Sequence, residues 1–89
     1  MSPSDFTFRL TVPNDPDGVR VVAAMAAHAV EYAKIDAGAG KAFVERVRDT
    51  AAHAFKSGSG APCLAVFAAE NGELTVTVGT ESASQPLPA

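Results

Sequence analysis

The chain has 89 residues, of which 47% are hydrophobic, and a formal net charge of −3 at pH 7. This length predicts one domain with a thin, alanine-rich core that a partner could complete. The chain has no basic run and no segment near the ~18 apolar residues that span a bilayer, and we expect no secretory signal at its start. We therefore expect no nucleic-acid binding, no membrane binding and a cytoplasmic location.

Residues 5–12 alternate between apolar and polar side chains. The apolar members are Phe6, Phe8, Leu10 and Val12. This period of two predicts a half-buried strand, which Pro13 ends. Asp15 followed by Pro16 predicts the start of a helix over residues 16–34, because aspartate caps a helix N-terminus and proline suits its first position.

Residues 39–56 form a second predicted helix, around which the chain is organised. Its apolar stripe consists of Phe43, Val47, Thr50, Ala51 and Ala54. Asp49 and His53 lie four residues apart, so both project from the same part of the helix surface. An ordinary surface pair is the simplest interpretation. A transition-metal site would need another ligand, and His28 is the only other histidine, so we expect no metal.

Asn71-Gly72 is a strong signal for a two-residue hairpin loop between strands at residues 62–69 and 73–79. The resulting register pairs Ala69 with Leu74, Phe67 with Val76 and Ala65 with Val78 on one apolar face. Cys63, near the start of this hairpin, is expected to be a small core residue. A single cysteine also fits a reducing compartment.

Residues 80–89 are rich in Ser, Pro and Ala, which predicts a disordered tail after a single domain over residues 1–79. The expected order is strand, helix, helix, strand, strand. The predicted fold is an α+β two-layer sandwich, with an antiparallel-rich sheet and both helices on one face.

Three stretches occur in a suggestive order: Val12-Pro13-Asn14-Asp15-Pro16, Asp49-Thr50-Ala51-Ala52-His53-Ala54-Phe55-Lys56-Ser57-Gly58 and Val78-Gly79-Thr80-Glu81-Ser82-Ala83-Ser84. With this order of elements, the chain resembles the first two-thirds of the histidine-kinase-like (GHKL) ATPase domain. It is most similar to bacterial anti-sigma factors of the serine-kinase type. The second stretch corresponds to the family's N box, and the third corresponds to its first glycine-containing box.

The resemblance implies positions for a nucleotide site, and all of them are altered. Asp49 stands where the family has a catalytic glutamate, and His53 stands where an asparagine holds Mg²⁺, for which nitrogen is a poor ligand. Thr80 replaces the aspartate that reads adenine, and Ser82 and Ser84 replace glycines. The family's ATP lid has no counterpart in the chain.

These departures imply a non-catalytic, regulatory protein–protein interaction module that needs no cofactor. The alternative is an ATP-binding anti-sigma factor or serine protein kinase with a divergent N box, using Mg·ATP and Asp49. If the fold ends near Gly79, the last strand has an unpaired edge. Its residues Leu74, Val76 and Val78 would then pair with a second copy in a homodimer or with another protein.

Overall fold

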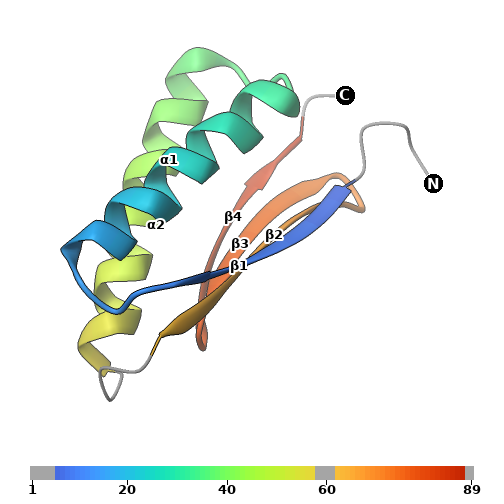
Figure 1. Cartoon of the computed structure of the whole chain (residues 1–89). Helices are drawn as coiled ribbons and strands as arrows, with labels where there is room; N and C mark the ends of the chain where they lie inside the picture. The colour runs from blue at the N-terminus through green and yellow to red at the C-terminus, as the bar shows by residue number, and fades with distance from the viewer. Residues whose placement is uncertain (1–5, 58–61, 88–89) are drawn as a thin grey trace.

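The computed structural model describes residues 6–57 and 62–87. Its elements are β1 (Phe6–Val12), α1 (Pro16–Tyr32), α2 (Ala37–Ser57), β2 (Cys63–Glu70), β3 (Glu73–Val78) and β4 (Glu81–Pro86). The strands form one antiparallel sheet in the order β1-β2-β3-β4, and both helices cover the same face of it (Figure 1). The predicted two-layer α+β fold is confirmed. Neither helix is long and apolar enough to cross a bilayer within the described residues.

The core lies between the helices and the sheet, and the sequence patterns account for it. Phe43, Val47 and Ala51 of α2 are completely buried, because they recur on one stripe of the helix. The β2–β3 hairpin has the predicted register, from the pair formed by Ala65 and Val78 to the pair of glutamates beside the loop. α1 packs over β1 and β2, whereas α2 packs over β3 and β4.

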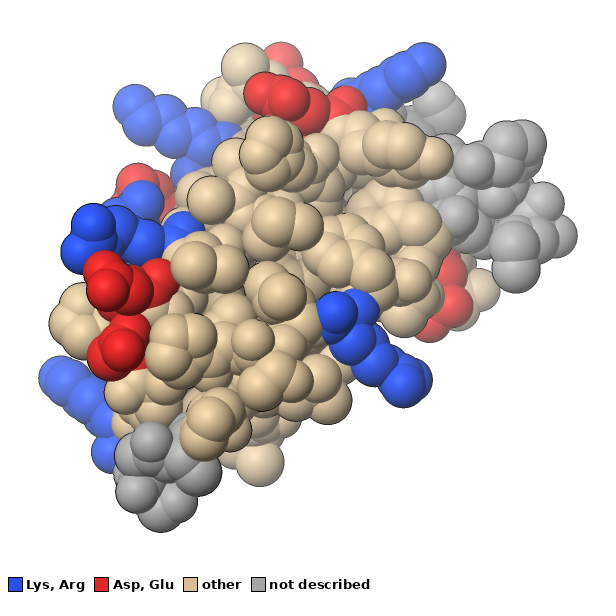
Figure 2. Space-filling view, viewed as in Figure 1, with Lys and Arg blue, Asp and Glu red and all other residues tan. Residues whose placement is uncertain are grey.

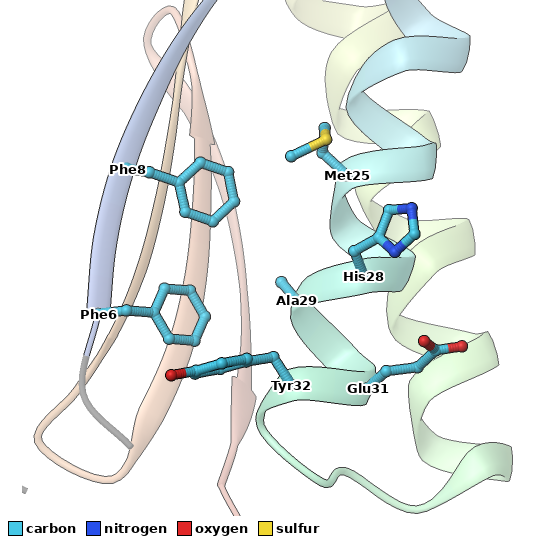
Figure 3. A pocket seen from close by; sticks show the side chains of 7 residues that line it. All are labelled: Phe6, Phe8, Met25, His28, Ala29, Glu31 and Tyr32. Carbon is cyan, nitrogen blue, oxygen red and sulfur yellow. The ribbon is translucent and has the colours of Figure 1, made fainter. Parts of the chain in front are cut away.

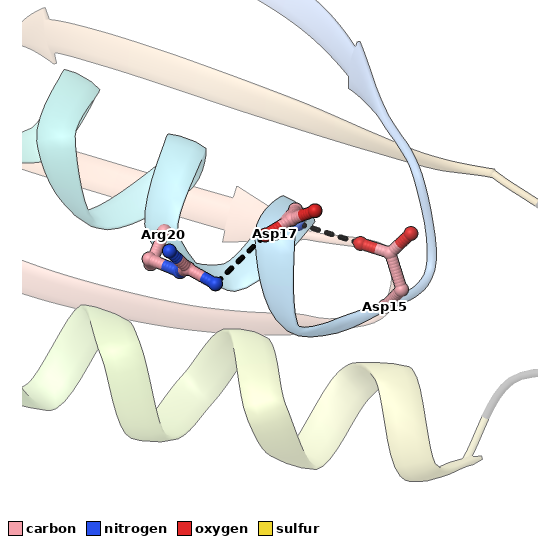
Figure 4. Close-up of polar contacts among 4 residues, drawn as sticks. Asp15, Asp17 and Arg20 are labelled. Carbon is pink, nitrogen blue, oxygen red and sulfur yellow. Dashed lines mark hydrogen bonds and ion pairs between the residues drawn. The ribbon is translucent and has the colours of Figure 1, made fainter.

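The start of α1 also follows the prediction. The Asp15 side chain accepts a hydrogen bond from the Gly18 backbone N–H at 3.0 Å (Figure 4), which satisfies one of the free amides of the first helical turn. Arg20 and Asp17 form an exposed ion pair at 2.8 Å on the same turn. The helix ends at Tyr32, two residues before the predicted end, and Lys34 takes a positive φ of 60°.

The sequence prediction is wrong after residue 79. Glu81–Pro86 form β4, which pairs with β3 over its whole length, so this segment is a strand and not a disordered tail. Gly79, with a φ of 61°, allows the tight reversal between the two strands. Only Ala83 contributes an apolar side chain to the core from this strand. The low hydrophobicity of β4 therefore concealed it. Residues 88 and 89 lie outside the described residues.

Because β4 pairs with β3, β3 is an interior strand of the sheet and not an edge strand. Leu74, Val76 and Val78 are each 0% exposed, and β3 lies between β2 and β4. The prediction that these three residues form an exposed edge for a partner is wrong, because β4 already uses that edge. In the part of the chain that the structure describes, the free edges of the sheet belong to β1 and β4.

Candidate functional site

A shallow polar hollow lies where α2 faces the beginning of β4. It has a volume of about 400 Å³, and the described residues that line it are Asp49, Thr50, His53, Glu81 and Ser82. Asp49 and His53 share this part of the α2 surface, as their spacing predicts. Ser82 lies at the edge of the same hollow, although strand alternation directs its side chain to the sheet face opposite the helices.

Two other residues of the predicted nucleotide site lie elsewhere. Thr80 is exposed in the turn between β3 and β4 and does not line the hollow. Ser84 pairs with Thr75, and its neighbour Ala83 packs on the core. Because side chains alternate along a strand, Ser84 belongs to the sheet face opposite the helices. Gly58 lies outside the described residues.

Two polar contacts tie α2 to β4. His53 Nδ1 donates to Glu81 Oε1 at 2.5 Å, and Arg46 donates to Gln85 Oε1 at 2.8 Å. Both contacts are at the surface. Glu81 and Gln85 flank Ala83 on the helix-facing side of β4, so a polar–apolar–polar pattern holds this strand against α2. Neither contact was predicted, because residues 80–89 were expected to form a disordered tail and the segment Glu81–Gln85 has no clear hydrophobic alternation.

The chemistry of the hollow does not favour a bare phosphate group. The described residues lining it include two carboxylates, Asp49 and Glu81, and no Lys or Arg. A triphosphate placed there would meet like charge at short range. Within residues 6–57 and 62–87, no group of three or more His, Cys, Asp or Glu side chains is arranged to hold a metal ion.

A larger, apolar groove lies between β1 and α1. Its volume is about 590 Å³, and the described residues lining it are Phe6, Phe8, Met25, His28, Ala29, Glu31 and Tyr32. Figure 3 shows Phe6, Phe8, Met25 and Tyr32 directed into the space between strand and helix, whereas Glu31 points away from the strand. The groove is therefore an apolar opening at the side of the core.

A row of aromatic rings connects this groove with the core. Phe8 stacks on the buried Phe67 at a centroid separation of 4.8 Å. Phe6 stacks on Phe8 at 5.8 Å, and Tyr32 meets Phe6 edge-on at 5.2 Å. Tyr32 is 63% exposed, so the row runs from the core to the surface. The core is thus incompletely covered beside β1.

α1 carries a second, exposed stripe next to β1. Its members are Val21, Met25, His28 and Tyr32. Their spacing of four, three and four residues places them on one side of the helix, and Val21 is 40% exposed. Together with Phe6, Phe8 and Leu10 of β1 they form what we call the β1–α1 surface. On the face that Figure 2 shows, charged side chains lie mainly toward the periphery.

No protein-family model, no curated protein and no solved structure matches this chain. The resemblance to the GHKL ATPase domain therefore stays a prediction from sequence motifs. Function has to be argued from the two sites above. The polar hollow was located in part from the sequence, whereas the β1–α1 surface was not, although the second stripe on α1 is readable from its spacing.

Proposed function

We propose that this chain is a non-catalytic protein-interaction module that binds protein through the β1–α1 surface. The observation that carries the proposal is the apolar groove beside a free strand edge. Exposed apolar patches next to an unpaired edge favour protein association over solvent contact. A regulatory role of the anti-sigma kind follows from the sequence resemblance and remains part of this proposal.

The register of the sheet indicates which backbone groups of β1 lie at its free edge. The Gly79 N–H donates to the Leu64 carbonyl at 3.1 Å, so the Leu64 backbone bonds toward β3. Hydrogen bonding alternates along an antiparallel strand, and Leu64 pairs with Thr11 of β1. Thr7, Arg9 and Thr11 therefore direct their N–H and C=O groups away from β2, where an added strand can bond to them.

The groove supplies specificity for such a strand. The side chains of an added strand alternate between the two sheet faces, so every second one enters the space between β1 and α1. That space is lined by Phe6, Met25 and Tyr32. Strand addition with alternate side chains held in pockets is a recurrent way of binding an extended peptide. We expect the bound segment to be extended, with apolar residues at alternate positions.

Selection of displayed peptides tests this function. The probe is a library of nine-residue peptides, offered to the full chain immobilised sparsely enough to keep copies apart. We expect the selected peptides to alternate in hydrophobicity and to lose binding to Tyr32→Glu. Ala27→Glu adds the same charge to the same helix at an exposed position outside the β1–α1 surface, and we expect it to bind normally. Failure to select any peptide that depends on Tyr32 would contradict the proposal.

A second candidate function is Mg·ATP binding, as in a serine protein kinase with a divergent N box. One observation favours it, namely that Asp49, His53 and Ser82 line the same hollow. Titration with Mg·ATP, read by amide NMR shifts and calorimetry, separates the two candidates. The interaction proposal predicts no saturable change at millimolar nucleotide. Saturable shifts at these residues that Asp49→Asn abolishes would favour the nucleotide-binding function instead.

A further inference from the structure

We propose that the protein bound by the β1–α1 surface is a second copy of this chain. The two β1 strands would pair antiparallel across a two-fold axis, joining two four-stranded sheets into one, while the two α1 helices pack antiparallel over the junction. This inference rests on the proposed function, because it names the partner of the same surface. Three features of the chain support it.

The first feature is that β1 itself has the pattern the groove requires. A fitting strand presents apolar side chains toward the helices, and the described part of the chain has two strands with free edges. The inner side of β4 carries Glu81 and Gln85, which already bond to α2. The inner side of β1 carries Phe6, Phe8 and Leu10, each of them only partly buried. The surface is therefore complementary to itself, as a two-fold interface must be.

The second feature is an acceptable register. Thr7 and Arg9 direct their backbone groups to the free edge, so an axis at Phe8 pairs Thr7 of each copy with Arg9 of the other. The same axis places Phe8 opposite Phe8 of the second copy, and Phe6 opposite Leu10. An axis at Arg9 would instead oppose two like charges, which is unfavourable directly across a strand pair. We therefore infer the register centred on Phe8.

The third feature is that the midpoint of the exposed α1 stripe and the β1 register place the two-fold axis at about the same point. The exposed stripe of α1 runs from Val21 to Tyr32, so its midpoint lies five to six residues before Tyr32, or about 8 Å along the helix. Tyr32 contacts Phe6, and α1 runs back along β1 from Pro13 (Figure 1). About 8 Å along a strand is two to three residues, which leads from Phe6 to Phe8 or Arg9.

Sedimentation velocity of the full chain over a concentration series tests the dimer. We expect a monomer–dimer equilibrium whose dissociation constant rises at least about tenfold in Tyr32→Glu. Arg9→Pro removes an edge N–H without touching the bonds to β2 and should also give monomers. The matched variants Ala27→Glu and Arg9→Val should still dimerise. Thermal unfolding of all four confirms that they fold.

Two results would overturn the dimer. The first is a wild-type chain that stays monomeric at about 100 µM, and the second is a dimer that both Tyr32→Glu and Arg9→Pro leave intact. The peptide selection distinguishes this failure from failure of the proposed function. A monomer that binds alternating peptides through Tyr32 rejects the second copy but keeps the interaction module. A monomer that selects no such peptide would contradict both the dimer and the interaction module.

Substitution at Thr7 tests the register. With the axis at Phe8, Thr7→Glu lies opposite Arg9 of the second copy and should tighten the dimer about two- to fivefold, whereas Thr7→Lys should weaken it by a similar factor. With the axis at Arg9, position 7 faces Thr11, and neither charge should matter. Equal affinities for the two variants would therefore overturn the Phe8-centred register.

Discussion

Tyr32 meets the ring of Phe6 edge-on with centroids 5.2 Å apart, although Tyr32 is 63% exposed. The contact joins the last turn of α1 to the first residue of β1 and forms one wall of the apolar groove. A large aromatic residue that packs on one side and faces solvent on the other is typical of the residues that dominate protein interfaces. In our proposal, this pair therefore contributes both to the stability of the fold and to partner binding.

Truncation of this contact should have a modest effect on the monomer. We expect Tyr32→Ala to lower the free energy of unfolding by about 0.5–1.5 kcal/mol, measured by urea denaturation at a concentration too low for dimers. Val21→Ala removes another exposed apolar side chain of the same stripe but replaces it with a better helix former, so its stability should hardly change. A loss in Val21→Ala as large as that in Tyr32→Ala would argue against a specific role of the ring contact.

The contact between His53 and Glu81 should contribute little to stability. Both side chains are substantially exposed, and exposed pairs typically contribute about 0.2–1 kcal/mol. A double-mutant cycle with His53→Ala and Glu81→Ala should give a coupling energy in that range. A coupling energy near zero would mean that the packing of Ala83 and the Arg46–Gln85 contact, and not this pair, hold β4 against α2.

Gly18 is required because the backbone of Pro13 passes close to it, and not because the position needs a flexible residue. A Cβ atom at this position would lie 1.9 Å from the Pro13 carbonyl oxygen, which belongs to the backbone and cannot move away cheaply. We expect Gly18→Ala to lower the free energy of unfolding by about 1–3 kcal/mol. Gly38→Ala, whose added Cβ would come no closer than 3.3 Å to the flexible Asp36 carboxylate, is the matched control and should be nearly neutral.

Deletion of residues 80–89 tests whether β4 belongs to the folded domain. The deletion removes a whole strand ladder and leaves β3 as an unpaired edge. We therefore expect a lower midpoint of urea denaturation. We also expect a tendency to aggregate, which light scattering would detect. A disordered tail, which the composition of this segment suggests, would instead be removable without either effect.

Elements that carry a local sequence pattern could be predicted from the sequence. Phe6 to Val12, the Asp15 cap and the Asn71-Gly72 loop each carry a local pattern, and the structure confirms all three. β4 was missed because it gains its stability from ladder bonds and from contacts to α2, which no local hydrophobic pattern reports. The error then propagated, because an absent β4 made β3 look like an edge.

The candidate sites also differ in how much of each could be predicted from local sequence patterns. The neighbourhood of Asp49 and His53 follows from helical spacing alone, whereas Glu81 becomes their neighbour only once β4 is placed. The groove beside Tyr32 depends on how far α1 stands off from β1, a tertiary distance that the sequence does not encode locally. Its position could not be predicted, although the exposed stripe that lines it could.

The most direct test of the central claim is the exchange of the backbone amide hydrogens at the free edge of β1. Among the described residues, the amides of Thr7 and Arg9 have no partner strand in the monomer, but they are hydrogen-bonded when a strand is added. We predict that both become protected from exchange as protein concentration rises, while the amides of β2 are protected throughout. Unprotected Thr7 and Arg9 at every concentration, and also in the presence of selected peptide, would contradict binding at this edge.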